Sequence, residues 1–302
     1  MLTIVIPSYN HENYITECLD AAREVDVVGR RIIVIDDGST DGTADIVRKY
    51  IEEYNDPAIE LVIKKNSGLT SSLNLGLSMT ITDYVYFVAS DDIPQSSGIL
   101  QCIDALEKIA SCQFCIGGGV NFFDCSTIDD TPVYGKRHRA FFTLPSVRRN
   151  QQIFLDYPAP LLLQSVVFRT AALRQIGGWD SNLKWDDYPV FVKLLARFPE
   201  LGSDFLYKPD VPVVRYRHHG ANTYKNLSKQ FFMVRQAMDA LAPAKIKERA
   251  IGNSLAFYSL AALRNRDIKT LLEMARTVSW RARVHILPAA ARIIARKVMN
   301  RS

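Results

Sequence analysis

The stretch Tyr84-Val85-Tyr86-Phe87-Val88-Ala89-Ser90-Asp91-Asp92 places two adjacent carboxylates shortly after five apolar or aromatic residues, with only Ala89 and Ser90 between them. The apolar run is typical of a buried strand, so both aspartates stand at its carboxyl end. Carboxylate oxygens suit Mg²⁺ and Mn²⁺, and Mg²⁺ often takes only one or two of them, leaving its other positions to phosphates and water. Asp is also common in turns, and by itself this stretch favours a solvent-exposed turn. The other segments of the chain decide between the two interpretations.

Three further segments repeat the pattern of a short apolar strand followed by a polar loop. The strands are expected at 2–6, 31–35 and 59–63, and their loops at 7–10, 36–39 and 64–68. Helical periodicity fills the intervals at 12–24, 41–53 and 69–79. This alternation predicts an α/β fold with a doubly wound, mostly parallel sheet and helices on both faces. Since ligands bind at the carboxyl ends of such strands, the loops and Asp91–Asp92 are predicted to line one crevice.

The chain after residue 95 is less regular. Helices are expected at 96–110, 146–155, 170–176 and 185–197, a buried strand at 161–168, and an edge strand with two prolines at 205–216. Residues 114–145 predict a strand, a mobile loop and a second strand. Their basic run, Lys136-Arg137-His138-Arg139, is expected in a solvated loop or, alternatively, in a flap that meets an anionic substrate. From Asn226 the pattern is mostly helical, which predicts two regions, 1–224 and 225–302.

Composition bounds the class of protein. The chain has 302 residues, 48% hydrophobic and 23% charged, which is ordinary for a globular protein and excludes disordered and fibrous classes. Residues 225–302 contain 16 Lys and Arg against 4 Asp and Glu, a net charge of +12, so residues 1–224 carry −7. A basic region behind an acidic one suggests an anionic partner, a membrane surface or nucleic acid. The uncharged run 250–263 is shorter than the roughly 20 residues that cross a bilayer.

The five cysteines indicate the redox compartment. They are Cys18, Cys102, Cys112, Cys115 and Cys125. Their number is odd, and the first seven residues are too short and lack the basic flank of a signal peptide. We therefore expect reduced thiols in a cytoplasmic protein. Cys112 and Cys115 form a single CxxC, which we interpret as a helix-to-strand junction because no second CxxC accompanies it.

Seven short motifs, in order and at matching spacing, make residues 1–224 resemble family 2 of the GT-A glycosyltransferases, inverting enzymes that use nucleotide-sugar donors. The motifs are Thr3-Ile4-Val5-Ile6-Pro7-Ser8-Tyr9-Asn10, Val34-Ile35-Asp36-Asp37-Gly38-Ser39-Thr40-Asp41-Gly42-Thr43, Asn66-Ser67-Gly68, Ala89-Ser90-Asp91-Asp92, Gly177-Gly178-Trp179-Asp180, Trp185-Asp186-Asp187 and Tyr216-Arg217-His218-His219-Gly220-Ala221-Asn222. The resemblance implies the GT-A fold, with residues 225–302 as a helical C-terminal region.

The resemblance assigns the nucleotide-sugar donor to the strand-end loops. Pro7 and Tyr9 match the loop that wraps the base, and Asp37 matches the acid that binds the base or ribose. Lys65 lies in the loop that approaches the diphosphate, although a solvated lysine is the simpler interpretation. Asp91 is the other donor-binding candidate, facing the ribose.

The resemblance also implies a bound Mn²⁺ or Mg²⁺. Asp92 and Asp91 match the metal-binding acids, and His219 matches a histidine that completes the site. The chain departs from many family members at Ala89, where they carry an additional acid. The expected ligand set is therefore small, and the metal affinity modest.

Inversion at the anomeric carbon requires a base that takes the proton of the acceptor hydroxyl. Asp187, at the start of a helix, matches that base by resemblance, with Asp186 as the alternative. As a neighbouring carboxylate, Asp186 would raise the pKa of Asp187 toward the working pH.

The sequence thus predicts a metal-dependent inverting glycosyltransferase that moves a sugar from a UDP-sugar to a glycan or lipid-linked glycan in surface polysaccharide synthesis. A sugar nucleotidyltransferase would need a glycine-rich, basic loop after the first strand, which Pro7-Ser8-Tyr9-Asn10-His11 is not. A non-catalytic nucleotide- or glycan-binding protein is compatible with Ala89, but Asp187 and His219 argue against it.

The basic C-terminal region leaves two interpretations open. It is either a solvated helical subdomain or, over 280–302, an amphipathic anchor on an anionic membrane at the inner face of the plasma membrane. Ile286, Leu287, Ile293 and Ile294 would then enter the bilayer. Nucleic acid is not expected as a partner, because the region lacks interleaved surface aromatics.

Overall fold

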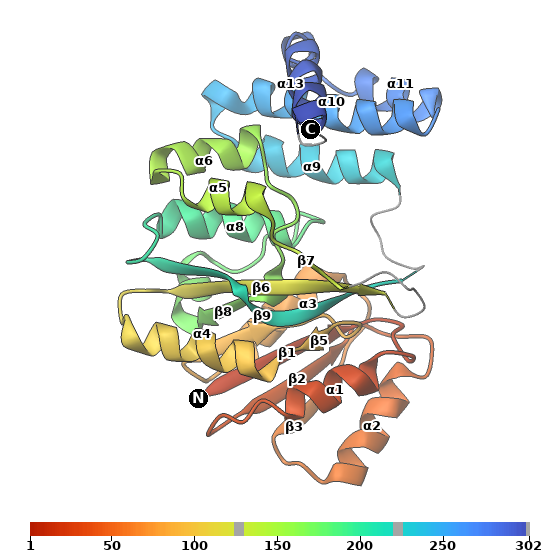
Figure 1. Cartoon of the computed structure of the whole chain (residues 1–302). Coiled ribbons are helices and arrows are strands. Elements are labelled where there is room, and N and C mark those ends of the chain that lie inside the picture. Colours follow the sequence, from red (N-terminus) through yellow and green to blue (C-terminus); the bar gives the residue numbers. More distant parts are fainter. Residues whose placement is uncertain (124–129, 220–225, 300–302) are drawn as a thin grey trace. The chain divides into compact units, whose positions relative to one another are not determined.

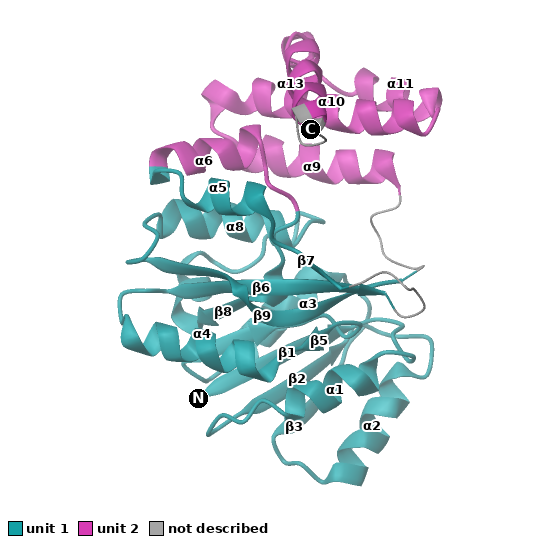
Figure 2. Cartoon of the chain, in the orientation of Figure 1, with its two compact units in different colours: residues 1–146, 160–220 teal, residues 147–159, 221–302 magenta. Residues whose placement is uncertain are grey.

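The computed structural model describes residues 1–123, 130–219 and 226–299 (Figure 1). The chain forms two compact units (Figure 2). Unit 1 consists of residues 1–146 and 160–220, and unit 2 of residues 147–159 and 221–302. The predicted boundary at 224 and 225 lies outside the described residues.

Unit 1 is built on one mixed sheet, whose order is β3-β2-β1-β4-β8-β6-β9-β5, with β7 paired to β6. The strands are β1 (Leu2–Ser8), β2 (Arg31–Asp36), β3 (Ile59–Ile63), β4 (Tyr84–Phe87), β5 (Ile93–Pro94), β6 (Phe114–Phe123), β7 (Thr131–Pro132), β8 (Val166–Arg169) and β9 (Phe205–His218). Strands β1 to β4 are mutually parallel, as the strand–helix alternation predicts. Farther along, β8 is antiparallel to β4 and β6, whereas β6 and β9 are parallel.

The helices of unit 1 flank both faces of this sheet (Figure 1). They are α1 (Ile15–Arg23), α2 (Thr43–Tyr54), α3 (Leu69–Met79), α4 (Ser96–Lys108), α5 (Lys136–Phe142), α7 (Thr170–Gln175) and α8 (Asp187–Arg197), with a 3-10 turn η1 (Leu163–Ser165). Right-handed crossovers put α1 and α2 on one face and α3 on the other, because the strand order reverses at β1. Helix α3 packs directly on β1, since a Cβ added to Gly76 would lie 2.3 Å from Val5 Cγ1.

Three local expectations differ from the structure. The run Lys136–Arg139 is not a loop but the first turn of α5, where Arg139 pairs with Asp210 at 3.0 Å. Strand β9 is not simply an edge strand, because it pairs with β6 on one side and at Val214–Arg215 with β5 on the other. The segment 161–168 was expected to be one strand, but the strand β8 begins only at residue 166 and covers Val166–Arg169. The residues just before it, Leu163–Ser165, form the turn η1.

Unit 2 consists of helices. They are α6 (Ser146–Leu155), α9 (Leu227–Leu241), α10 (Ala244–Arg264), α11 (Ile268–Arg276), α12 (Trp280–Arg283) and α13 (Ile286–Met299). Helix α10 is central and contacts α9, α11, α12 and α13. Asn253 on α10 donates a hydrogen bond to the Leu155 carbonyl at 2.9 Å, which ties in the segment 147–159. None of the described helices is long and apolar enough to span a bilayer.

The described cysteines carry no disulfide. Cys18, Cys102, Cys112 and Cys115 are buried free thiols, and Cys125 lies outside the described residues. Cys112 follows α4 and Cys115 lies in β6, so the CxxC is the helix-to-strand junction that the spacing indicates.

Candidate active site

The loops after β1 and β2 are bound to each other at the carboxyl edge of the sheet. The Thr40 backbone N–H donates to Asn10 Oδ1 at 2.8 Å, and the His11 N–H donates to Thr43 Oγ1 at 2.9 Å. Asn10 has φ 55°, a left-handed conformation that Asn adopts more readily than most residues. Beside this loop, Pro7 is buried in β1 and Tyr9 is 45% exposed. The loop therefore offers an exposed aromatic ring on a firmly held backbone.

Asp37 fastens the loop that follows β3. Its carboxylate accepts the backbone N–H groups of Ser67 at 2.9 Å and Gly68 at 2.8 Å, and it forms an ion pair with Lys64. Lys65 is exposed and makes no such contact with Asp37. The structure thus places Asp37 at the predicted edge, while the donor-binding roles of Asp37 and Lys65 stay predictions.

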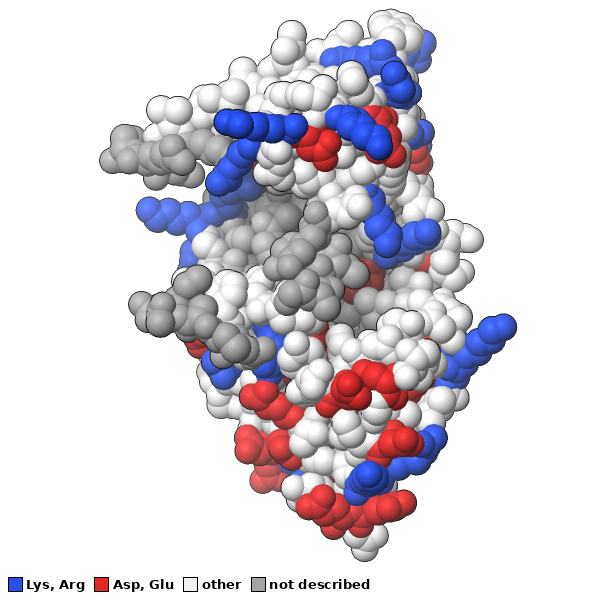
Figure 3. All heavy atoms as spheres, turned by 90° about the vertical axis from the view of Figure 1, so that its right-hand side faces the viewer, with Lys and Arg blue, Asp and Glu red and all other residues white. Residues whose placement is uncertain are grey.

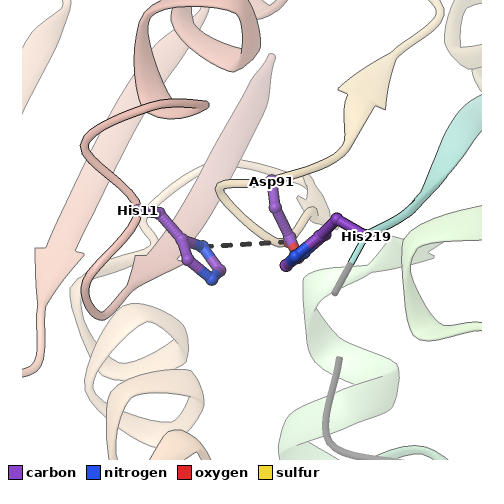
Figure 4. A group of neighbouring side chains, drawn as sticks. All are labelled: His11, Asp91 and His219. Atoms are coloured by element: carbon purple, nitrogen blue, oxygen red, sulfur yellow. Dashed lines mark hydrogen bonds and ion pairs between the residues drawn. The ribbon is translucent and has the colours of Figure 1, made fainter. Parts of the chain in front are cut away.

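Asp91 lies between two histidines that come from different elements (Figure 4). His219 Nε2 is 2.9 Å from Asp91 Oδ2, and His11 Nδ1 is 3.9 Å from Asp91 Oδ1. One donor atom from each residue lies within 4.8 Å of the others. His11 Nδ1 also lies 2.7 Å from Ser90 Oγ. A set of two imidazoles and one carboxylate, partly open to solvent, fits a divalent transition-metal ion.

Asp92 is not part of this cluster. Its side chain is 1% exposed, and both oxygens accept hydrogen bonds, from the Arg217 backbone N–H at 2.8 Å and from Gln164 Nε2 at 2.8 Å. Burial raises the pKa of Asp92 well above its usual range, and the charge of Asp91 raises it further. The structure brings Asp91 and His219 together as predicted, and it adds His11 where Asp92 was expected.

Arg217 joins the end of β9 to the loop that carries Asp91. Its guanidinium donates to the Asp91 carbonyl at 2.7 Å and forms an ion pair with Glu17 on α1. It also lies over the rings of Tyr14 and Phe122, at 5.1 and 4.6 Å. These contacts fix the end of β9, and His219, two residues after Arg217, contacts Asp91 from there.

Asp187 and Asp92 hold the same short turn, η1. The Leu163 N–H donates to Asp187 Oδ1 at 2.8 Å, and the next residue, Gln164, donates to Asp92. Burial raises the pKa of Asp187 well above its usual range, and the charges of Asp186 and Asp92 raise it further. Burial also raises the pKa of Asp186. The Asp187 carboxylate therefore accepts a proton more readily than an ordinary aspartate.

The turn before α8 is held by α3. Asn74 Oδ1 accepts the Trp179 N–H at 2.9 Å, and Asn74 Nδ2 donates to the Trp179 carbonyl at 2.8 Å. Gly177 and Gly178 have φ of 75° and 58°, which glycine adopts without strain. The motif thus directs the chain into α8, at whose first residue Asp187 stands.

Sequence reasoning missed His11, Gln164 and Arg217. The sequence did contain a signal for His11: it follows the first strand, so its loop belongs to the same edge of the sheet as Asp91. His218, in contrast, turns away from the cluster: its Nε2 is 2.9 Å from Asn121 Oδ1, and its ring stacks on Phe123. Burial and His219 lower the pKa of His218.

A family comparison is consistent with this geometry. The sequence profile described as "Glycosyl transferase family 2" matches residues 3–167, more than half of the chain. The chain belongs to glycosyl transferase family 2. The matched region includes the loops after β1, β2 and β4 and the turn η1, and Asp187 and His219 lie beyond it.

Curated relatives of this glycosyl transferase family 2 chain include chondroitin synthase of Pasteurella multocida, 30% identical over 123 residues. That match covers 40% of this chain but only 12% of the synthase. An uncharacterised glycosyltransferase of Rickettsia typhi is 28% identical over 234 residues, which are 74% of this chain and 65% of the relative. The chain thus spans less than two thirds of the length of either relative.

Solved structures share the GT-A fold. Staphylococcus aureus TarS, in complex with UDP-GlcNAc, has a TM-score of 0.61 at 17% identity and covers 94% of this chain and 83% of that one. A mannosyltransferase of Pyrobaculum calidifontis, in complex with GDP-Man and Mn²⁺, has a TM-score of 0.57 at 18% identity, covering 97% and 80%. At this identity the likeness establishes the fold.

The role of Arg217 as an anchor gives a stability prediction. Arg217→Lys should lower the free energy of unfolding by about 1–3 kcal/mol, because an ammonium cannot serve both the Asp91 carbonyl and Glu17 from this buried position. Arg215→Lys is the matched control: Arg215 also lies over Phe122, at 4.3 Å, but its side chain is 37% exposed, against 6% for Arg217. Its effect should be about 0.5 kcal/mol or less. Urea unfolding measures both, and equal losses would contradict the anchoring role.

Proposed function

We propose that this chain is a metal-dependent inverting glycosyltransferase that transfers a sugar from a UDP-sugar to a glycan or lipid-linked glycan acceptor in surface polysaccharide synthesis. One observation carries the proposal: a half-buried carboxylate with raised pKa, Asp187, shares the turn η1 with Asp92, the neighbour of the His11, Asp91 and His219 cluster. A proton acceptor and a cation site at one sheet edge are the two parts that this reaction requires.

The reaction follows from these positions. Asp187 accepts the proton of the acceptor hydroxyl while the hydroxyl oxygen bonds to the anomeric carbon. The bond between that carbon and the phosphate oxygen breaks, and the nucleoside diphosphate leaves with the bonding electrons. A divalent metal ion, held by Asp91 and His219, would neutralise charge on the diphosphate. The exposed Tyr9 and the strand-end carboxylate Asp37 are the proposed contacts of the nucleoside.

The donor and the product are inferred from the relatives. One structural neighbour is in complex with UDP-GlcNAc and another with GDP-Man and Mn²⁺. A relative is named chondroitin synthase, a polysaccharide-forming enzyme. A UDP-linked hexose or N-acetylhexosamine is therefore the first donor to test, with Mn²⁺ or Mg²⁺. The loop after β1 contains no glycine-rich, basic segment, which disfavours the nucleotidyltransferase alternative.

The assignment of Asp187 as base gives a direct test. Asp187→Asn should lower the transfer rate at least about 100-fold, since the amide cannot accept the proton. Its affinity for UDP should change little, because the amide oxygen can still accept the Leu163 N–H. Thermal shift with UDP-, GDP- and dTDP-sugars, with and without Mn²⁺, measures binding, and a donor-turnover assay measures transfer. Full activity of the variant would contradict the base assignment.

The neighbouring carboxylate predicts a pH effect. Asp187 must be ionised to act, so the rate should fall as pH drops through its raised pKa. Asp186→Asn removes a charge that raises the pKa of Asp187, so the acid limb of kcat/KM should move to lower pH. Asp180→Asn removes a charge from the preceding motif and serves as the control. An acid limb that stays in place, or moves to higher pH, would refute the coupling.

The membrane interpretation concerns the surface of unit 2. In α13, Ile286 and Ile293 are half-buried, whereas Leu287 and Ile294 are exposed. Trp280 on α12 is 71% exposed and lies between Ser279 and Arg281. Lys and Arg side chains outnumber Asp and Glu on the face of unit 2 that Figure 3 presents. We propose that 280–302 binds an anionic bilayer peripherally, with Trp280 and Leu287 entering it.

Vesicle sedimentation tests this anchor. The double variant Trp280→Ser/Leu287→Ser should bind vesicles of phosphatidylglycerol and phosphatidylcholine at least about tenfold more weakly than the unaltered chain. Val28→Ser, which replaces an exposed apolar residue of unit 1, is the control. Binding that is equal for all three proteins, or equally strong on phosphatidylcholine alone, would exclude the anchor.

A further inference from the structure

We propose that His11 is a third protein ligand of the metal, and that the set His11, Asp91 and His219 selects Mn²⁺ or a later transition metal over Mg²⁺. The inference rests on the proposed function in one respect: a glycosyltransferase that uses a nucleotide-sugar can use a divalent ion to bind the diphosphate. It concerns the ligand set itself, and it can be tested in the absence of any donor sugar.

The two histidines approach opposite oxygens of one carboxylate. His219 Nε2 lies 2.9 Å from Asp91 Oδ2, and His11 Nδ1 lies 3.9 Å from Asp91 Oδ1. Figure 4 shows the three side chains pointing toward one another. Ligand atoms bonded to one ion at about 2.1 Å can be up to about 4.2 Å apart. The observed spread of 4.8 Å therefore needs only a small inward movement.

The position of His11 is fixed by its backbone and its neighbours. Its N–H donates to Thr43, and its carbonyl accepts the N–H groups of Tyr14 and Ile15 at 3.0 Å each. The Tyr14 ring contacts both imidazoles, with centroids 5.9 Å from His11 and 4.8 Å from His219. The side chain of His11 is 25% exposed, so an ion can reach it. An imidazole that is oriented before the ion arrives loses little freedom when it binds.

The neighbouring acid is not available for the same role. Both carboxylate oxygens of Asp92 already accept hydrogen bonds, from Arg217 and Gln164, in a site that is 1% exposed. Asp92 has no oxygen within the 4.8 Å cluster, so its side chain would have to move to reach the ion. That movement would break these hydrogen bonds and leave a buried N–H unpaired, which costs about 1–3 kcal/mol. Coordination through His11 Nδ1 replaces its hydrogen bond with Ser90 Oγ at 2.7 Å, and the buried Ser90 hydroxyl must then rotate to another acceptor. The imidazole itself already lies in the cluster and needs no such movement of its backbone.

The donor atoms determine the choice of metal. Mg²⁺ prefers oxygen ligands and gives up water reluctantly, whereas imidazole nitrogen suits transition metals. With two nitrogens and one carboxylate oxygen, the affinity should follow the usual order in which Mn²⁺ is bound less tightly than Co²⁺. The chain lacks the extra acid at Ala89, and His11 supplies the missing ligand in a different chemical form.

The experiment measures Mn²⁺ binding to the full chain without nucleotide, from the loss of the free Mn²⁺ EPR signal, with Mg²⁺ as competitor. The unaltered chain should bind Mn²⁺ at least about tenfold more tightly than Mg²⁺. His11→Ala should weaken Mn²⁺ binding at least about tenfold and reduce the preference over Mg²⁺. His218→Ala is the matched control, one residue from His219 but turned toward Asn121, and should retain the affinity. A smaller loss for His11→Ala, or an equal loss for His218→Ala, overturns the proposal.

A second measurement does not depend on how the variants fold. Pulsed EPR of Mn²⁺ on the unaltered chain should show directly bound nitrogen from two imidazoles, and a single imidazole would overturn the proposal. Donor turnover separates the two claims. Intact transfer with unchanged Mn²⁺ affinity in His11→Ala would refute the ligand but keep the enzyme. Nitrogen-bound Mn²⁺ without turnover of any nucleotide-sugar would support the ligand set but refute the proposed glycosyltransferase activity.

Discussion

The hydrogen bond from the Arg217 backbone N–H to the Asp92 carboxylate, 2.8 Å long, connects the end of β9 to the loop after β4. These two elements are 125 residues apart in the chain, and β9 does not pair with β4 in the sheet. Together with the neighbouring β5–β9 ladder, in which Ile93 pairs with Arg215, this hydrogen bond sets the position of His219 relative to Asp91. The Arg217 guanidinium strengthens the connection through the Asp91 carbonyl. The geometry of the site therefore depends on a buried carboxylate that does not itself face the cluster.

The acids of the site divide into two kinds. Asp92 and Asp187 use their oxygens to hold backbone or amide groups, and burial and mutual repulsion raise the pKa of both. Asp91 instead faces two histidines and is accessible to an ion. A bound cation would offset the repulsion among these carboxylates, so metal binding and the ionisation of Asp187 are thermodynamically linked. Whether a metal ion is bound would therefore affect the protonation state of Asp187, the proposed base.

The sequence predicted the first half of the fold well, because it rests on local signals. The strands at 2–6, 31–35 and 59–63 and the helix at 69–79 follow from apolar runs and helical periodicity, and the structure places them at those positions. The position of β9 between β6 and the short β5 could not be foreseen, since its pairing with β6 is made across the chain and its two prolines indicate an edge. The helix at Lys136 was missed because a run of basic residues has no apolar period, while its buried face comes from His138 and Phe142.

The site, like the fold, could be predicted where local motifs mark it and not where it depends on contacts between distant segments. Asp91, His219 and Asp187 were found through motifs at strand and helix ends, and the structure brings Asp91 and His219 into contact. The difference between Asp91 and Asp92 could not be read from the sequence, because adjacent residues at a strand end turn in different directions. Which of them is buried depends on Gln164 and Arg217, residues with no motif of their own. His11 was overlooked for a similar reason, because its relevance depends on Asp91, which lies near it in the fold but far from it in the sequence.

The composition of unit 2 from two separate stretches has a consequence for synthesis. Residues 147–159 leave the ribosome before any part of 221–302 exists, although they belong to the same unit. During that interval α6, whose side chains Ile153 and Phe154 are buried in the folded protein, lacks the helices of 221–302 that belong to the same unit. Unit 1 also cannot finish its sheet until β9 has emerged, because β9 lies between β6 and β5. Neither unit of this chain can therefore be completed until its later stretch has been synthesised, and apolar surface of the earlier stretch stays uncovered until then.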